Sequence, residues 1–228
     1  MTPRFSVIAL SGGDSSRLGA LIDHVRIVGY GKAVEIIVCG EASPDSPDSS
    51  DSTGPAAYAA GRPGVRLATA AGGRAAKYNA GAALAFGDVV MFIEAGTRLP
   101  ARAFDLAADC LTDGRAGGGA FGVEAACAGL AARLLVRARS VLSRLTGRPL
   151  GDQALFMRRD LLARLGGFRR DDELAELELT GAARRAGAVI RVLGERAGVP
   201  GERYDAPGGT RLAWRETLRV ARGIVLRA

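Results

Sequence analysis

The stretch from Gly87 to Pro100 constrains the fold of this chain more than any other. Five apolar residues, Val89 to Ile93, are followed directly by a polar turn with one acid, Glu94 to Thr97. A run of this length is too short to span a membrane and is typical of a buried strand in a parallel sheet. Because ligands gather at the carboxyl ends of such strands, the sequence predicts that the turn at 94–97 faces a binding site.

Short apolar runs alternate with amphipathic stretches along the rest of the chain. We expect strands at about 5–10, 35–39, 65–68, 89–93, 117–123 and 189–193, with one more within 150–159. Helices are expected between them, over 18–25, 75–85, 100–111, 125–145 and 160–165, and the acidic cluster at 171–179 opens another. This order predicts an α/β fold with a mostly parallel sheet. The 228 residues are enough for one such domain, spanning the whole chain.

Two segments depart from this alternation. Residues 41–64 are rich in Ser, Pro, Asp and Gly without an apolar period, which predicts a mobile loop. The tail at about 210–227 has an apolar stripe that includes Trp214 and Leu218, with arginines on another side, so a cationic amphipathic helix is expected. Docking of this helix on the domain is the favoured interpretation, and peripheral contact with an anionic membrane surface is the alternative.

Composition excludes several kinds of protein. The net charge of +7 favours an anionic partner, but no basic motif with interleaved aromatic residues occurs, so nucleic-acid binding is not expected. The three cysteines lack C-x-x-C spacing, and the single histidine, His24, cannot complete a zinc site with them. No apolar run approaches the ~18 residues of a membrane helix. We therefore expect a cytoplasmic protein, at most peripheral to the inner face of the membrane.

A glycine turn follows the first predicted strand. Ser11, Gly12 and Gly13 stand between this strand and the next helix. Glycines let the backbone approach a ligand closely, and the N–H groups at a helix start can bind phosphate. A simple tight turn capped by Ser15 or Ser16 is the alternative interpretation.

Four segments match a known family in their order along the chain. They are RAAKYNAGAALAFG at 74–87, VVMFIEAGTRL at 89–99, SRLTGRPLGDQALFMRRD at 143–160, and LGGF at 165–168. Together they resemble the family-2 glycosyltransferases, and most closely the subgroup named radical-SAM/selenodomain-associated transferases. The resemblance covers the chain from Phe5 to about Arg222. It implies a GT-A fold, a Rossmann-type three-layer α/β sandwich in which a nucleotide-diphosphate sugar lies across the strand ends.

The resemblance also implies roles in nucleotide binding. The turn at 11–13 occupies the family's first loop, and Arg74 and Asn79 match family positions, where an arginine can meet a phosphate oxygen through charge-assisted hydrogen bonds. After the second strand, Gly40 replaces the Asp that the family directs toward the base or ribose, and the neighbouring Glu41 is the candidate in its place.

A metal site is implied after the fourth strand. The family places an Asp-containing triplet there, whose carboxylates hold Mg²⁺ or Mn²⁺ against the diphosphate. In this chain the triplet is Glu94-Ala95-Gly96, so Gly96 stands at the Asp position and Glu94 is the candidate metal ligand.

The general base is implied by an acidic helix. The family's Glu-Asp pair aligns with Ala175-Glu176, which makes Glu176 the candidate base for the acceptor hydroxyl. Asp152 is the second candidate, either as base or as the residue that orients the acceptor. Gln153 is a candidate for a hydrogen bond to a sugar hydroxyl.

The predicted function is therefore sugar transfer from a nucleotide-diphosphate sugar to an unknown acceptor, with an altered metal site. The changes at Gly40, Gly96 and Ala175 favour one alternative, a catalytically inactive GT-A relative that binds a nucleotide or a protein partner. A nucleotidyltransferase is the third hypothesis, because Leu10 to Gly19 is similar to the signature loop of the molybdopterin guanylyltransferase type. That similarity covers ten residues, whereas the glycosyltransferase resemblance covers most of the chain.

Overall fold

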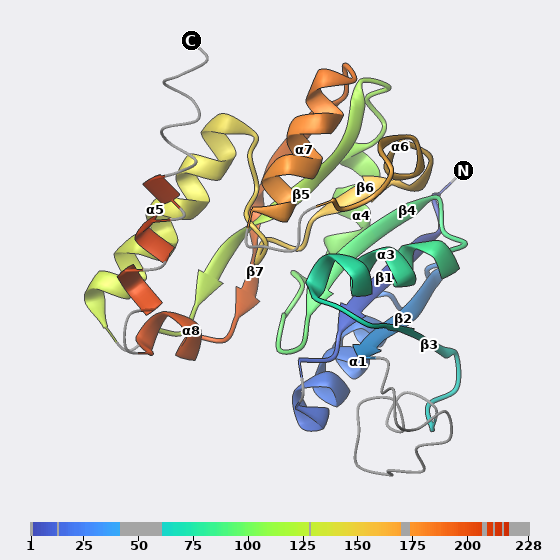
Figure 1. The fold of residues 1–228 in the computed structure, drawn as a ribbon, viewed down its shortest axis with the longest axis horizontal. Coiled ribbons are helices and arrows are strands. Elements are labelled where there is room, and N and C mark those ends of the chain that lie inside the picture. Colours follow the sequence, from blue (N-terminus) through green and yellow to red (C-terminus); the bar gives the residue numbers. More distant parts are fainter. Residues whose placement is uncertain are drawn as a thin grey trace.

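A seven-stranded sheet forms the centre of the computed structural model, in the order β3-β2-β1-β4-β6-β5-β7 (Figure 1). The structure describes residues 2–12, 14–41, 61–127, 129–169, 174–206, 209–211, 213–215 and 217–218. The strands are β1 Phe5–Leu10, β2 Val34–Glu41, β3 Val65–Ala70, β4 Val89–Glu94, β5 Ala116–Ala125, β6 Phe156–Arg158 and β7 Val189–Val199. Only β6 runs antiparallel to its neighbours, β4 and β5. The predicted α/β fold with a mostly parallel sheet is confirmed.

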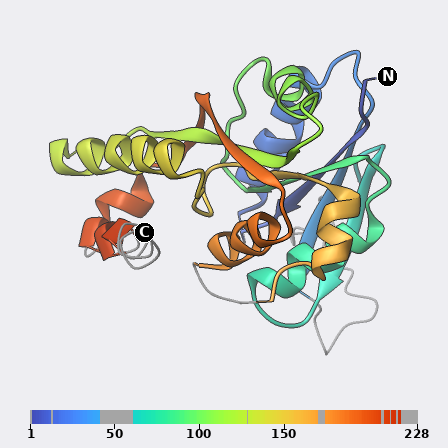
Figure 2. The same cartoon turned by 90° about the horizontal axis from the view of Figure 1, so that it is seen from above.

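Helices cover both faces of the sheet. They are α1 Ser15–Val28, α3 Arg74–Leu84, α4 Ala103–Cys110, α5 Leu130–Thr146, α6 Arg159–Leu165, α7 Ala175–Arg185 and the short α8 Glu202–Asp205. Figure 2 shows α1 and α4 on one face, and α3, α6 and α7 on the other. The predicted three layers are therefore present.

Alternate residues of the central strands supply the two cores. On β4, Met91 and Ile93 belong to the apolar cluster beneath α1 and α4, whereas Val90 and Phe92 belong to the cluster beneath α3, α6 and α7. Successive side chains of a strand point to opposite faces, so an unbroken apolar run is what a strand covered on both sides requires. This explains why the run at 89–93 contains no polar residue.

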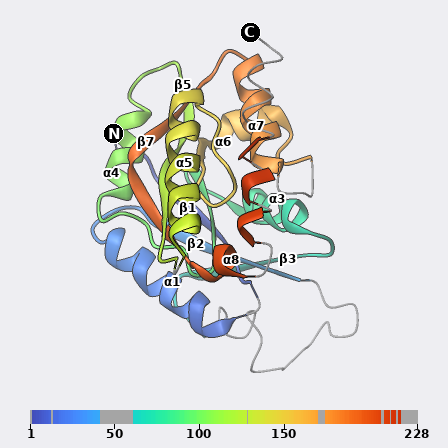
Figure 3. The same cartoon turned by 90° about the vertical axis from the view of Figure 1, so that its left-hand side faces the viewer.

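The element bounds differ most from the prediction at β7 and α5. Strand β7 continues to Val199 instead of ending near Leu193, because its parallel pairing with β5 extends to Ala125. Helix α5 consequently begins at Leu130 instead of near Ala125. It runs alongside β5 and β7 at one side of the molecule (Figure 3).

The predicted loop and tail are only partly described. Residues 42–60 of the expected loop at 41–64 lie outside the described residues, as do 212, 216 and 219–227 of the expected tail helix. Residues 209–211, 213–215 and 217–218 of the tail are helical. Within the described part of the chain, no helix combines the length and apolarity needed to cross a membrane.

Candidate functional site

A cavity of about 650 Å³ opens at the carboxyl ends of β1, β2 and β4. Glu94, Ala95 and Thr97, from the turn that follows β4, line one side of it. Asp152 and Glu202 also line it. This is the edge of the sheet where the sequence predicts a binding site.

The glycine turn after β1 forms another part of the cavity wall. Ser11 and Gly12 line the cavity, and Gly13 lies outside the described residues. The prediction that a serine caps α1 is wrong: the carboxylate of Asp14 accepts hydrogen bonds from the backbone N–H groups of Ser16 and Arg17, at 2.9 and 3.2 Å. An aspartate can satisfy both of these helix-start donors at once.

Arg74, the first residue of α3, connects three separate segments at the cavity. Its Nε lies 2.9 Å from a carboxylate oxygen of Glu94, and its Nη2 lies 2.6 Å from a carboxylate oxygen of Glu176. The same Nη2 donates a hydrogen bond of 3.0 Å to the backbone carbonyl of Gly151. Arg74 itself lines the cavity. Its guanidinium is therefore fixed in place by β4, α7 and the segment before β6.

Two further cations line the same cavity. Lys77 lies one turn after Arg74 on α3, and its Nζ is 3.0 Å from the carboxylate of Glu41, which is the last residue of β2 and largely exposed. Arg17 donates two hydrogen bonds of 3.0 Å to Glu202 across the cavity. Each of the three cations thus has a carboxylate partner, and all three face one space.

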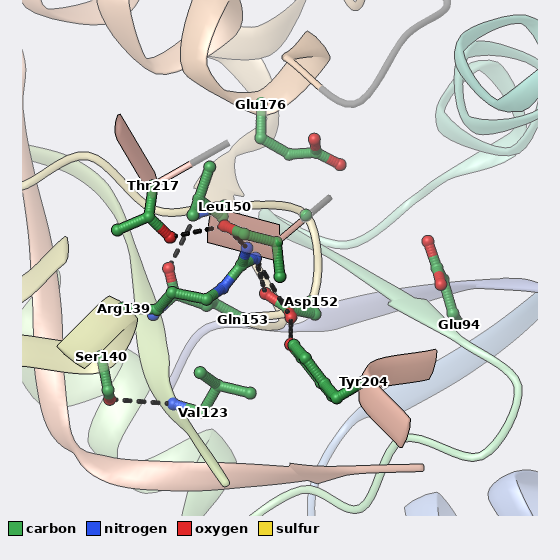
Figure 4. A network of polar contacts seen from close by, with 12 residues as sticks. Glu94, Val123, Arg139, Ser140, Leu150, Asp152, Gln153, Glu176, Tyr204 and Thr217 are labelled. Carbon is green, nitrogen blue, oxygen red and sulfur yellow. Dashed lines mark hydrogen bonds and ion pairs between the residues drawn. The ribbon is translucent and has the colours of Figure 1, made fainter. Parts of the chain in front are cut away.

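Glu176 lies behind Arg74 and is 1% exposed. Burial raises the pKa of its carboxyl to about 7, and the nearby guanidinium of Arg74 opposes this shift. Figure 4 shows the side chains of Glu176, from α7, and of Glu94, from β4, on the same side of Asp152. Arg74 separates the carboxylate of Glu176 from the cavity, so the candidate base is close to the cavity without lining it.

Asp152 lines the cavity but directs its carboxylate into a buried network (Figure 4). Arg139 Nη2 lies 3.3 Å from both carboxylate oxygens, and the Tyr204 hydroxyl donates to one of them. Arg139 also donates to the backbone carbonyl of Ala213 at 3.3 Å. The side chains of Arg139 and Asp152 are 2% and 4% exposed. This network ties α5 to α8 and to the described part of the tail.

Asn79 and Gln153, for which the resemblance implies contacts with the nucleotide and the sugar, do not line the cavity. Asn79 exchanges two hydrogen bonds with the backbone of Phe168, at 2.8 and 2.9 Å. Gln153, which is 1% exposed, accepts from the N–H of Leu150 at 2.7 Å and donates to the carbonyl of Phe121 at 3.1 Å. Both side chains hold backbone segments in place, and neither lines the cavity.

The turn after β4 does not fit the implied metal site. The backbone N–H of Thr97 donates a hydrogen bond of 3.0 Å to the carbonyl of Glu94 and closes this turn. Its third residue, Gly96, has a φ of +89°, a conformation that favours glycine. A Cβ at Gly96 would lie 2.7 Å from Cγ of Pro200. The carboxylate of Glu94 is paired with Arg74. Among the described residues, no three His, Cys, Asp or Glu side chains gather as a metal site.

We predict that the Gly96→Asp variant does not gain a Mn²⁺ site and loses about 1–3 kcal/mol of unfolding free energy, because both its φ and the contact with Pro200 oppose a side chain. Urea unfolding and a calorimetric Mn²⁺ titration measure the two effects. Gly31→Asp is the control, because Gly31 has a φ of +73° but nothing within 4 Å of an added Cβ. Tight Mn²⁺ binding by a fully stable Gly96→Asp variant would contradict this account of the turn.

Arg17, Lys77, Arg139 and Tyr204 were not among the predicted site residues. A signal for Arg139 exists, since it falls on the buried stripe of α5 with Ala132 and Ser143. Arg17 lies within the glycine-rich segment at 10–19 that resembles a phosphate-binding loop. Nothing in the local sequence distinguishes Tyr204.

No protein-family model matches the sequence, and no curated protein matches it. Solved structures do match. A mannosyltransferase from Pyrobaculum calidifontis, in complex with GDP-Man and Mn²⁺, has a TM-score of 0.70 at 20% identity, over 100% of this chain and 65% of that chain. TarS from S. aureus has a TM-score of 0.62 at 13% identity, over 99% and 66% of the two chains.

A third match is glucosyl-3-phosphoglycerate synthase from Mycobacterium tuberculosis, in complex with Mn²⁺, uridine-diphosphate and phosphoglyceric acid. Its TM-score is 0.59 at 17% identity, over 96% of this chain and 78% of that chain. The present chain spans slightly under two thirds of the length of the first two proteins. At these identities the likeness shows the fold, and the predicted GT-A fold is confirmed.

Proposed function

We propose that the protein is a glycosyltransferase that takes its sugar from a nucleotide-diphosphate donor bound in the 650 Å³ cavity. The observation that carries the proposal is the convergence of Arg17, Arg74 and Lys77 on this cavity at the carboxyl edge of a GT-A sheet. The matched structures with GDP-Man and with uridine-diphosphate support this class of donor. The four matched segments favour the radical-SAM/selenodomain-associated subgroup of family 2.

The cations of the cavity supply the charge that a departing diphosphate needs. Breaking the bond between the sugar and the diphosphate places negative charge on the leaving phosphate, and fixed positive groups stabilise that charge. Arg74 is the central group, because its planar guanidinium can donate two parallel hydrogen bonds to phosphate oxygens. Its ion pairs with Glu94 and Glu176 hold it at the cavity before the donor binds. The turn at 94–97 does not fit a metal, so no step is assigned to one.

Glu176 is the proposed general base for the acceptor hydroxyl. A pKa of about 7 suits a group that must accept a proton near neutral pH. Its carboxylate is covered by Arg74, 2.6 Å away, so its action as base requires Arg74 to exchange this ion pair for contacts with the bound diphosphate. Asp152 is not proposed as the base, because both of its carboxylate oxygens are bonded to Arg139, and its proposed role is to hold Arg139 and Tyr204 in place behind the cavity.

We predict that Arg74→Gln weakens donor binding by about 10–100-fold, which corresponds to the loss of a charged hydrogen-bond donor. Calorimetric titration with UDP-, GDP- and dTDP-sugars measures the change. Arg164→Gln is the matched control, because Arg164 is exposed and, among the described residues, pairs only with Asp160 on its own helix, at 2.7 Å. Equal donor affinity in the Arg74→Gln variant and the wild type would show that Arg74 does not bind the donor. Donor binding with no sugar transfer or donor hydrolysis would instead favour the inactive relative.

A further inference from the structure

A second hollow, of about 530 Å³, adjoins the proposed donor cavity. Val199 and Pro200 line both spaces, and Gly96 lines the second one. A two-way backbone bridge between Arg98 and Gly198, with both hydrogen bonds 2.8 Å long, joins the turn after β4 to β7 beside it. We call this second hollow the arginine groove. Most of its lining residues come from α5 and from the carboxyl ends of β5 and β7, and these elements are neighbours in Figures 1 and 3.

Four arginines and one acid line the arginine groove. The arginines come from three elements: Arg98 follows β4, Arg133 and Arg137 lie one turn apart on α5, and Arg196 belongs to β7. The acid is Glu124. The groove therefore carries an excess of positive charge at a place where the parallel strands end.

The four guanidinium groups have no partner within the described part of the chain. None of them forms an ion pair or a side-chain hydrogen bond there. Many arginines elsewhere in the described part of the chain bond to a carboxylate or to a backbone carbonyl, although Arg102, Arg144 and Arg185 do not; those that do include Arg4, Arg17, Arg26, Arg66, Arg74, Arg139, Arg158, Arg159, Arg164, Arg184 and Arg191. Like charges held together repel one another, and a bound anion relieves that repulsion. The groove is thus a place where four arginines without such a partner, from three elements, line one hollow.

We propose that the arginine groove binds a phosphate group carried by the acceptor substrate. Guanidinium groups match the geometry of phosphate oxygens and donate charge-assisted hydrogen bonds to them. The acceptor would lie across Val199 and Pro200, with its phosphate in the groove and its reacting hydroxyl at the donor cavity. The acceptor role rests on the proposed glycosyltransferase function. The phosphate belongs either to a soluble phosphate ester or to a lipid headgroup.

Two probes distinguish the sources of the phosphate. Glycerol 3-phosphate, titrated calorimetrically, represents the soluble ester, and sedimentation with vesicles of phosphatidic acid and phosphatidylcholine represents the lipid. The Arg133→Gln/Arg137→Gln variant should bind at least one of these probes about ten-fold more weakly than the wild type. The matched control is Arg144→Gln/Arg185→Gln, which removes the same charge at exposed positions outside the groove. The control should bind as the wild type does.

Binding of glycerol 3-phosphate places a soluble ester in the groove, and binding of vesicles alone places a lipid phosphate there. Binding of neither probe, or an equal loss in both double variants, would overturn the proposal. A parallel titration with nucleotide-diphosphate sugars keeps the two hypotheses separate. If no donor binds while glycerol 3-phosphate does, the proposed function fails and the phosphate site stands.

Discussion

The Glu176→Gln variant is expected to lose about 10²–10⁴-fold in turnover while its donor affinity stays close to that of the wild type, because it removes a proton acceptor and keeps the shape of the side chain. Hydrolysis of the nucleotide-diphosphate sugar, with water as the acceptor, measures turnover without knowledge of the natural acceptor. Calorimetric titration measures donor affinity. The two measurements separate a loss of chemistry from a loss of binding.

The pH profile gives the same prediction a second readout. Glu176 accepts a proton only when it is ionised, and burial raises its pKa to about 7. Wild-type hydrolysis should therefore rise between about pH 6 and pH 8, and this rise should vanish in the Glu176→Gln variant. Glu94→Gln is the control, since Glu94 pairs with the same Arg74 but is not the proposed base. A rise with pH that survives in Glu176→Gln would refute the role of Glu176.

The Asp152→Ala variant is expected to lose about 3–5 kcal/mol of unfolding free energy. The substitution leaves the charge of Arg139 buried without its carboxylate, in a site where both side chains are almost inaccessible, at 2% and 4% exposure. It also removes the acceptor of the Tyr204 hydroxyl bond, so the packing of α8 against α5 loses a polar contact. Urea unfolding, followed by circular dichroism, measures the loss.

Asp160→Ala provides the comparison for Asp152→Ala. Asp160 also pairs with an arginine, Arg164, but their side chains are 66% and 65% exposed. Water screens such a pair, and its removal should cost about 1 kcal/mol or less. Similar losses in the two variants would show that the Arg139–Asp152 pair does not hold the tail and α5 to the cavity.

Local pattern was enough to predict the layers of this fold. The apolar run of β4 consists of consecutive residues, so it is visible in the sequence itself. It is unbroken because the strand is buried on both faces. The ends of β7 and α5 were harder to predict. They depend on how far β7 pairs with β5, which is a contact between residues more than 70 positions apart, such as Ala125 and Val199.

The polar contacts of the site join residues that lie far apart in the sequence, so local sequence patterns do not predict them. Arg74 and Glu176 are 102 positions apart, and the residues next to them in the sequence do not indicate that they form an ion pair. The resemblance named both residues, but not the fact that one covers the other. It also implied nucleotide and sugar contacts for Asn79 and Gln153, whose side chains instead fix backbone segments.

The structure explains why residue 96, at the implied metal position, is a glycine. In the sequence it is a missing carboxylate at a metal position. In the structure it is the residue that a turn with positive φ requires beside Pro200, while Arg74 occupies the carboxylate of Glu94. Gly96 therefore supplies no metal ligand, and the nearby carboxylate of Glu94 is already paired with a fixed cation.

Titration of the wild-type protein with UDP-, GDP- and dTDP-sugars, in the presence of EDTA, tests the central claim most directly. Since Arg17, Arg74 and Lys77 supply the positive charge of the cavity, we expect at least one donor to bind with no divalent ion present, and added Mn²⁺ to change its affinity little. Binding that requires Mn²⁺ would contradict the assignment of charge neutralisation to these side chains. The absence of binding for every donor, with and without Mn²⁺, would contradict the proposed function itself.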